Sequence, residues 1–467
     1  MSTTGSATVP SRAAVARGLA RATYLSFGLF AVLSLSIPSW RVGPFTWWPV
    51  LRLQEFAGEP AQIGILSLLP GLFLLCWIGW RWLEQPRRPW LWGRPAVVLP
   101  LAGLAVLTAV SLGPALFTPA AVRPVVSLAV VGVFYLFYVN ERPRLTPILA
   151  PVLLIQGSVA VAQFLLQRDL GLTALGERTL GPTVPKTSLI EVGSTYWVRG
   201  YGLAAHPNVL ATLLAVGLLI VLVELHQARQ AAISPGPRWQ RVVVALALAA
   251  GLAGLLVSFS RAGWLAFAAG LAVWTLAAAK TWSAAERRQA SAGLAVGLAI
   301  AAAFVVRYRD LVATRLWRLS TPLEAKSINE RLRDAQLALE LIKAHPWLGV
   351  GPGNYVPTVR ALEPEAIAVH NIPLLLAAEL GLPALGLLVW LWAAPFVRLE
   401  RGAGGRGLAV RLVLLPAAAP WVAMIVESLF DVAMWWGASW KTAMLVGLLA
   451  ALQSVAEPPS AHRRPTR

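Results

Sequence analysis

The stretch TPILAPVLLIQGSVAVAQFLL, residues 146–166, carries no charged side chain over its whole length. About 20 mostly apolar residues are enough for one α-helix to cross the hydrocarbon core of a bilayer. The stretch therefore predicts a membrane-spanning helix. The fold class of the whole chain depends on how often this pattern recurs.

About twelve such stretches occur along the chain. They lie at residues 24–37, 62–80, 95–112, 124–139, 146–166, 207–224, 242–257, 262–279, 290–306, 371–397, 412–429 and 432–452. The composition agrees, because 57% of the 467 residues are hydrophobic and only 13% are charged, against about 25% charged residues in ordinary soluble domains. We therefore expect an all-α, polytopic membrane helix bundle with a small helical cap on its extracytoplasmic side.

The cysteine count and the distribution of charged residues exclude other classes of protein. A single cysteine, Cys76, allows neither an intramolecular disulfide nor a thiolate metal cluster. A formal net charge of +19 is compatible with nucleic-acid binding, but the 40 Lys and Arg residues are scattered between the apolar stretches and form no basic domain. We interpret them as signals of membrane orientation and expect no nucleic-acid partner.

Lys and Arg gather in alternate connections, as expected of residues that resist transfer across the membrane. Examples are Arg81, Arg87, Arg88 and Arg94; Arg229, Arg238 and Arg241; and Arg398, Arg401, Arg406 and Arg411. This alternation places both terminal tails, 1–23 and 453–467, in the cytoplasm, and the start of the chain does not resemble a cleaved signal peptide. Two long connections then face outward, 167–206 and 307–370, and we expect the functional site there.

These connections divide the chain. A first bundle of about nine helices covers residues 24–306, the large outer loop covers 307–370, and the last three helices cover 371–452. The first outer loop contains LGLTALGERTLGPTVP, a Gly- and Pro-containing segment that we expect to be mobile.

The segment SINERLRDAQLALELIKAHP, residues 327–346, predicts an amphipathic helix over about 328–344. Ser327 and Glu330 have the spacing of a capping box, and Pro346 would end the helix. Its apolar face would consist of Ile328, Leu332, Ala335, Leu339 and Ile342. The helix would lie over the outer mouth of the bundle, and the alternative is a lid that merely covers apolar helix ends.

Gly349, Gly351 and Gly353 follow this helix and predict a tight turn. Exposed amides in such a turn are suited to holding an anion. A nucleotide-binding fingerprint would instead follow a strand and open a helix. This run follows a helix on the outer side, so the nucleotide interpretation is not favoured.

Cationic and polar side chains stand at three helix starts that would face outward, near residues 207, 262 and 371. These side chains are Arg199, His206, Arg261, His370 and Asn371. Helix N-termini attract anions, and the planar fork of arginine suits phosphate oxygens. The pattern predicts a phosphate site, while snorkelling or a structural ion pair is the alternative for each arginine.

His370 differs from the arginines because a histidine titrates near neutral pH and can take a proton from a hydroxyl as a general base. A capping histidine is the alternative, and His206 and His345, both followed by proline, fit a cap or turn better. Glu379 lies on the same predicted helix as Asn371 and is either a supporting site residue or part of a packing network.

Further charged residues lie at membrane level without an assigned role. These are Glu427, Asp431 and Lys441, which pair with one another in the simplest interpretation. The sequence has no Asp-x-Asp motif and no two histidines at ligand spacing on one helix. We therefore expect no metal site and no cofactor.

Two segments together resemble a known family. RLRDAQLALELIKAHPWLGVGPGNY (331–355) and HNIPLLLAAELGLPALG (370–386) closely resemble the signature region of the O-antigen ligase and O-antigen polymerase superfamily, which contains bacterial polytopic membrane glycan ligases and polymerases. RGYGLAAHPNVLA (199–211) and SFSRAGWL (258–265) are similar to earlier outer-face segments of that family. The resemblance is strong over about 327–386 and elsewhere rests on hydropathy and topology.

The resemblance implies a C-type glycosyltransferase architecture in the bacterial cytoplasmic (inner) membrane. It implies transfer of a glycan from a polyprenyl-pyrophosphate carrier, such as undecaprenyl pyrophosphate, to a hydroxyl acceptor at the outer face, without metal or nucleotide. The partners would be that lipid-linked donor, a glycan or lipid acceptor and the bilayer. This places the protein in cell-surface polysaccharide or lipopolysaccharide biosynthesis.

Carried over by position, the family's phosphate-binding arginines fall on Arg199 and Arg261 and its catalytic histidine on His370. Direct displacement would invert the anomeric carbon. Asn371 and Glu379 would support the site. Ligases carry Gly, Thr or Tyr at the place of Ala384. This departure weakens the ligase interpretation relative to the polymerase one, but the sequence does not separate the two activities.

Two other functions compete. One is a transporter of a small anion such as bicarbonate, which would place charged groups near the bilayer midplane, whereas the notable cations here lie at the outer face. The other is a non-catalytic assembly partner, in which His370 is replaceable without loss.

Overall fold

The computed structural model describes residues 11–36, 41–42, 45–46, 68–84, 88–113, 115, 118–233, 236–317, 322–364, 366–401, 408–412, 414–435 and 440–455. Parts of the expected features fall outside these ranges. They are the ends of both tails, the first part of the predicted helix 62–80, Arg87, Arg406 and the side chain of Lys441.

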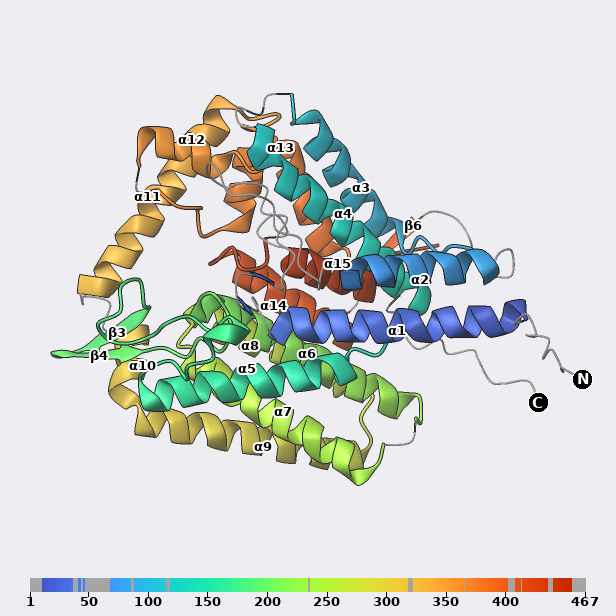
Figure 1. Cartoon of the computed structure of the whole chain (residues 1–467), viewed down its shortest axis with the longest axis horizontal. Helices are drawn as coiled ribbons and strands as arrows, with labels where there is room; N and C mark the ends of the chain where they lie inside the picture. The colour runs from blue at the N-terminus through green and yellow to red at the C-terminus, as the bar shows by residue number, and fades with distance from the viewer. Residues whose placement is uncertain are drawn as a thin grey trace, which may run out of the picture.

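Within these ranges the chain forms fifteen α-helices, two 3-10 helices and three two-stranded antiparallel sheets (Figure 1). The α-helices are α1 (Arg12–Ser36), α2 (Leu68–Glu84), α3 (Pro95–Val110), α4 (Thr118–Glu141), α5 (Thr146–Leu166), α6 (Pro207–Gln230), α7 (Arg238–Val257), α8 (Arg261–Ala278), α9 (Ala284–Arg307), α10 (Arg309–Leu316), α11 (Pro322–Ala344), α12 (Tyr355–Leu362), α13 (Ile372–Ala393), α14 (Ala419–Ser428) and α15 (Trp440–Val455). The 3-10 helices are η2 (Thr173–Leu175) and η3 (Pro416–Ala418), and the strands are β1 (Arg41–Val42), β2 (Phe45–Thr46), β3 (Leu189–Val192), β4 (Thr195–Val198), β5 (Val397–Arg401) and β6 (Leu408–Leu412).

Each of the twelve predicted membrane stretches overlaps one of these helices. Eight helices in the described part are long and apolar enough to cross a bilayer: α1, α4, α5, α6, α7, α8, α9 and α13. The others, α2, α3, α14 and α15, are shorter there. The expected fold class, a polytopic helical membrane protein, is confirmed.

Helix α6 lies at the centre of one half of the molecule, packed against α5, α7, α8 and α14. Most of its residues are buried by protein, whereas α9, at the edge, buries only Phe304. A second half contains α3, α4, α13 and α15, and α4 packs along α15. Both α6 and α9 contain a long apolar stretch. The apolar side chains of α6 contact other helices, and those of α9 face the bilayer.

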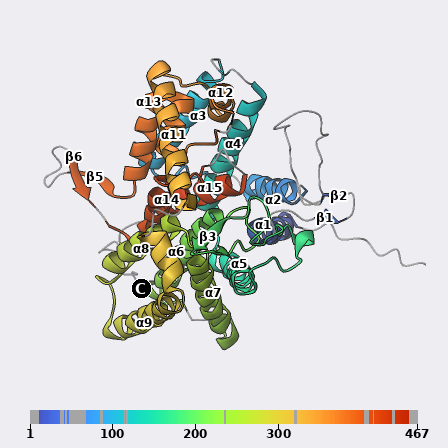
Figure 2. The ribbon, with the colours of Figure 1, turned by 90° about the vertical axis from the view of Figure 1, so that its left-hand side faces the viewer.

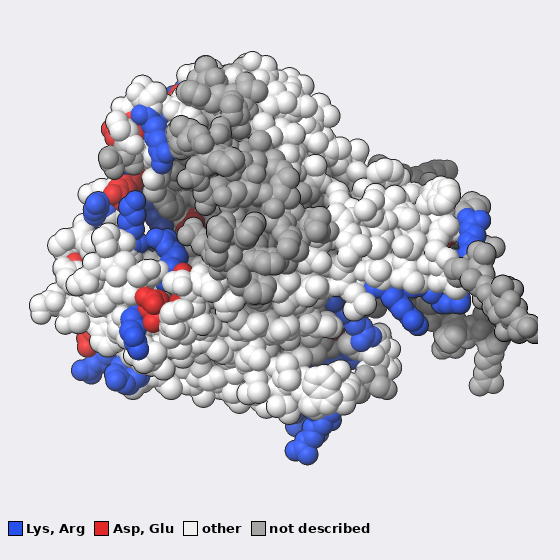
Figure 3. All heavy atoms as spheres, viewed as in Figure 1, with Lys and Arg blue, Asp and Glu red and all other residues white. Residues whose placement is uncertain are grey.

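Charged side chains gather at two opposite ends of the molecule, with a mostly uncharged surface between them (Figure 3). Helices α1, α5, α7 and α9 run between these ends (Figure 1). An uncharged belt of this kind is the surface that lipid tails solvate. The β3–β4 hairpin, α10 and α11 lie together at one end and form what we call the cap.

The prediction of a membrane stretch over 412–429 was wrong in its extent. A hairpin, β5–β6, occupies residues up to Leu412, and α14 covers only ten residues from Ala419. Pro416 and Pro420 lie at the starts of η3 and α14. Proline lacks an amide hydrogen and is best tolerated in the first turn of a helix, so both positions suit helix starts.

Two other helix starts differ from the predictions. Helix α1 begins at Arg12, inside the segment expected as a cytoplasmic tail. Helix α15 begins at Trp440, whereas the sequence predicted a membrane helix from Val432. Residues 432–435 instead form a turn, so the last two helices are not joined as closely as expected.

The amphipathic helix of the outer loop exists as α11, but it begins at Pro322. Ser327 therefore lies inside the helix and does not cap it. Its buried side chains are Glu324, Asp334, Ala338 and Leu341, while Leu332 and Leu339 from the predicted apolar face are exposed. The predicted face was wrong at Leu332 and Leu339, whereas Ala335 and Ile342 pack against the core. An ion pair of Glu324 and the burial of Asp334, which hydropathy cannot foresee, turn these two carboxylates inward. Figure 2 looks onto the cap end, where α11 crosses between the two halves.

Candidate active site

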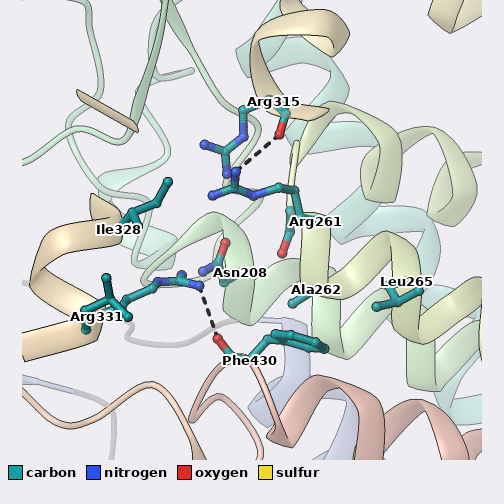
Figure 4. Close-up of a pocket in the computed structure, with 10 residues that line it drawn as sticks. Asn208, Arg261, Ala262, Leu265, Arg315, Ile328, Arg331 and Phe430 are labelled. Carbon is teal, nitrogen blue, oxygen red and sulfur yellow. Dashed lines mark hydrogen bonds between the residues drawn. The ribbon is translucent and has the colours of Figure 1, made fainter. Parts of the chain in front are cut away.

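A cavity of about 570 Å³ opens at the cap end, where the starts of α6 and α8 meet α10, α11 and the turn after α14 (Figure 4). Its lining combines cationic and apolar side chains. The lining residues are Asn208, Ser260, Arg261, Ala262, Leu265, Arg315, Ile328, Arg331, Leu332 and Phe430. Three of these are arginines, so the cavity is suited to a ligand with concentrated negative charge.

Arg261 is the first residue of α8, and Ser260 caps that helix by accepting a hydrogen bond from the amide of Gly263. The Arg261 guanidinium lies 3.1 Å from a carboxylate oxygen of Glu324, which is buried at the start of α11. Arg315 of α10 pairs with the other oxygen of the same carboxylate. One carboxylate thus holds two guanidinium groups, which leaves a net positive charge at the cavity.

Arg315 and Arg199 bracket the turn between α7 and α8. The Arg315 Nε donates to the carbonyl oxygen of Phe259 at 3.1 Å, and the Arg199 Nε donates to that of Ser258 at 2.7 Å. Phe259 has φ +48°, a left-handed conformation that is unfavourable for a non-glycine residue. The two arginines therefore stabilise a strained turn that directs Arg261 into the cavity.

Arg199 itself lies behind the cavity wall. It follows the β3–β4 hairpin, is only 4% exposed, and donates to Ser188 Oγ and Asn208 Oδ1, both at 2.8 Å. Burial, aided by the charge of Arg315, holds the pKa of Arg199 well below its usual range. Arg199 is not among the residues that line the cavity, but it donates a hydrogen bond to Asn208, which is.

Arg331 approaches from the other side, on α11. Its guanidinium donates to the carbonyl oxygen of Phe430 at 3.4 Å and faces Arg261 across the cavity (Figure 4). The sequence pattern predicted no function for Arg331 and did not distinguish Arg315 or Glu324 from other charged residues. The only signal for them was the density of charge in an otherwise apolar chain, which does not say which charges meet.

The two histidines near the helix starts have different surroundings. His206 caps α6, because its Nδ1 accepts the amide of Asn208 at 3.2 Å, as the sequence suggested. Burial and the charge of Arg199 lower the pKa of His206 to about 3. The Nδ1 atom of His370 is buried and has no hydrogen-bond partner among the described residues.

Burial also lowers the pKa of His370 below its ordinary value. The carboxylate of Asp431 opposes this shift and Arg331 adds to it. A histidine with a lowered pKa is neutral at pH 7 and so can accept a proton. His370 is not among the residues that line the cavity, but it lies within electrostatic range of Arg331, which does.

Asn371 caps α13. Its Oδ1 accepts the amide of Leu374 and its Nδ2 donates to the carbonyl oxygen of Leu429, both at 2.9 Å. Leu429 directly precedes Phe430 of the cavity wall. Asn371 thereby fixes the residue next to it, His370, relative to the turn after α14.

Glu379 belongs to a different contact. Its Oε1 accepts the amide of Tyr355 at 3.4 Å, and the carbonyl groups of Ala378 and Glu379 accept the amides of Val350 and Gly351. The glycine turn thus docks on α13, which is broken at Gly381 (φ +83°). The amides expected to hold an anion are used for this contact, so that prediction was wrong for Val350 and Gly351.

Gly381→Ala should lower the free energy of unfolding by about 1–3 kcal/mol, because its backbone conformation is one that essentially only glycine adopts. A Cβ there would also lie 2.2 Å from the carbonyl oxygen of Trp347. Gly386 on the same helix has open space around it, so Gly386→Ala is the matched control and should cause no loss. Thermal unfolding in detergent compares the two; an equal effect would contradict the role of Gly381.

The structure thus brings Arg261, Arg315 and Arg331 together at one cavity, with Arg199 and His370 next to it and Glu379 in the contact behind the glycine turn. Within the described ranges no three His, Cys, Asp or Glu side chains gather in a way that would hold a metal ion.

Comparison with known proteins agrees with the earlier resemblance. Residues 244–389 match a family described as O-antigen ligase. The match includes Arg261, Arg315, Arg331 and His370 and ends before Asp431. It supports enzymatic ligation or polymerisation of cell-surface glycans in a bacterial multi-pass membrane protein, and gives no support to a transporter. A search of curated proteins finds no match to the chain.

Proposed function

We propose, from the premise that residues 244–389 place this chain in the O-antigen ligase superfamily, that it transfers a glycan from a polyprenyl-pyrophosphate carrier to a hydroxyl acceptor. The reaction would take place at the outer face of the bacterial cytoplasmic membrane, with both termini in the cytoplasm. The observation that carries the proposal is the convergence of Arg261, Arg315 and Arg331 on one cavity beside His370.

A pyrophosphate leaving group matches the charge of this cavity. Arginine forks bind phosphate oxygens in two-point contacts, and fixed cations stabilise the charge that develops as the group leaves. Glu324 keeps the guanidinium groups of Arg261 and Arg315 together before any donor binds. Arg199 supports the same wall through Asn208.

The apolar part of the cavity suits the carrier lipid. Leu265, Leu332 and Phe430 line it and are 45–60% exposed. Leu265 lies one turn from Arg261 on a membrane helix, so a bound pyrophosphate has apolar surface next to it. An amphiphile with an anionic head and an apolar chain fits this arrangement better than a free inorganic anion does.

His370 would act on the acceptor. The acceptor hydroxyl would attack the anomeric carbon, His370 would take the hydroxyl proton, and the bond from that carbon to the phosphate oxygen would break. The pyrophosphate would leave on its carrier with its charge neutralised by the arginines, and the anomeric centre would invert. Two features of His370 support this role: its Nδ1 has no hydrogen-bond partner among the described residues, and its pKa is lowered.

Glycan transfer in proteoliposomes tests the proposal. The purified chain would be supplied with an undecaprenyl-pyrophosphate-linked glycan, and with the same glycan on undecaprenyl monophosphate as the control donor. We expect transfer from the pyrophosphate donor only, and product length separates a polymerase from a ligase. Transfer should continue in EDTA, because the mechanism uses no metal. Absence of transfer from a range of donors and acceptors would overturn the proposal, and solute uptake would be measured next.

A further inference from the structure

The turn that follows α14, Leu429 to Asp431, connects three elements of the site. The carbonyl oxygen of Leu429 accepts from Asn371 at the start of α13, and that of Phe430 accepts from Arg331 of α11. The Oδ2 of Asp431 accepts from Asn208 Nδ2 at 2.5 Å, at the start of α6. One short turn thus fixes the relative positions of the histidine-bearing segment, the cap helix and the α6 N-terminus.

Asp431 is the charged member of this turn. It is buried, its Oδ1 accepts the amide of Val432 at 2.7 Å, and it forms no ion pair with Lys or Arg in the described part of the chain. Asn208 also contacts Arg199, because the Asn208 Oδ1 accepts a hydrogen bond from the Arg199 guanidinium. A buried carboxylate without a direct cationic partner is costly, and a cation that forms nearby would offset part of that cost.

His370 is the group on which that carboxylate acts. Asp431 is the strongest charge acting on His370, and Arg331 opposes it; Asp334 and Glu330 of α11 act in the same direction as Asp431, more weakly. His206 at the start of α6 lies within range of both His370 and Asp431. Three elements, the turn after α14, α11 and the start of α6, therefore present charges or titratable groups to His370.

We propose that Asp431 is a positioning residue for His370: it holds the turn that orients the imidazole, and its charge stabilises the imidazolium formed when His370 takes the proton of the acceptor. This role rests on the proposed glycan transfer, in which that proton comes from the acceptor hydroxyl. In a poorly solvated site a carboxylate stabilises a transient cation far more than it would in water.

Asp431→Asn tests this with little change of shape, because the amide oxygen of the new side chain can still accept from Asn208. Removing the negative charge should lower the pKa of His370 further, so the imidazole stays neutral to lower pH. The acidic limb of the pH profile of kcat then moves to lower pH, kcat at the optimum falls by up to about 10²-fold, and KM for the donor is unchanged.

A titration of His370 by NMR gives a readout that does not require activity. Histidine Cε1 signals of the labelled protein in detergent micelles, assigned with His370→Gln, report its midpoint in each variant. Asp310→Asn removes an exposed carboxylate of α10 and is the matched control, with no shift of midpoint or of kcat. Asp431→Glu keeps the charge and should restore the midpoint.

A folded Asp431→Asn protein with an unchanged His370 midpoint would overturn the inference, as would an unchanged kcat in a chain that transfers glycan. If Asp431→Asn does not fold, Asp431→Ser is judged by the same two readouts. If the unaltered chain transfers no glycan, the proposed function fails. The titration still decides whether Asp431 controls His370.

Discussion

His370→Gln should lower the rate of glycan transfer by about 10²- to 10⁴-fold, the usual contribution of a general base. Glutamine is similar in size and polar, but it cannot take a proton at neutral pH. Because His370 precedes the α13 cap and its Nδ1 makes no hydrogen bond to a described residue, the substitution removes little structure. Single-turnover transfer at saturating donor would measure the loss, which should fall on kcat with donor KM unchanged.

His345→Gln is the matched control for this experiment. His345 is exposed after the end of α11, on the same outer side of the chain. Its replacement should leave the rate as it is. If His370→Gln unfolds at the same temperature as the unaltered protein and transfers at the same rate, His370 is not the base. The non-catalytic alternative then gains support.

Arg261→Ala should lower kcat/KM for the pyrophosphate donor by about 10²- to 10³-fold, comparable to removing one group that stabilises developing negative charge. Arg261→Lys keeps the charge but loses the planar fork, and we expect it to recover only part of the rate. Glu324 retains Arg315 as a partner in both variants, so the buried carboxylate is not left alone. The donor dependence of the initial rate separates the effects on KM and kcat.

Arg309→Ala provides the comparison for Arg261. Arg309 lies nearby on α10, but its side chain is 83% exposed and its ion pair is with the neighbouring Asp310, so transfer should be unaffected. Equal losses in both variants would point to a general effect of charge at the cap. An unimpaired Arg261→Ala protein would remove this arginine from the proposed site.

The sequence predicted which parts of the chain lie in the membrane. It did not predict which of those helices contact lipid and which contact other helices. Helices α6 and α9 have similar apolar stretches, yet α6 is buried among four helices and α9 is almost entirely exposed. Hydropathy measures the free energy of leaving water, which is much the same for a lipid and for a protein neighbour. The position of each helix in the bundle therefore depends on packing between side chains.

The candidate site shows the same division. Arg199, Arg261, His370 and Asn371 could be singled out because they stand at helix starts that face one side of the membrane. Arg315 and Arg331 could not, since their meeting depends on α10 and α11 folding back over α8. Asp431 was noticed as a charge at membrane level, but its partner, Asn208, is distant in the chain.

By itself, the sequence determined that this chain has many apolar helices able to cross a membrane. That result follows from local composition, because burying charge in lipid costs free energy wherever the residue lies. Only the tertiary structure decided that Glu324 joins two arginines, that the glycine turn docks on broken α13, and that Asp431 lies within electrostatic range of His206 and His370. Ion pairs and hydrogen bonds act over a few ångströms in space, and spacing along the chain does not fix those distances.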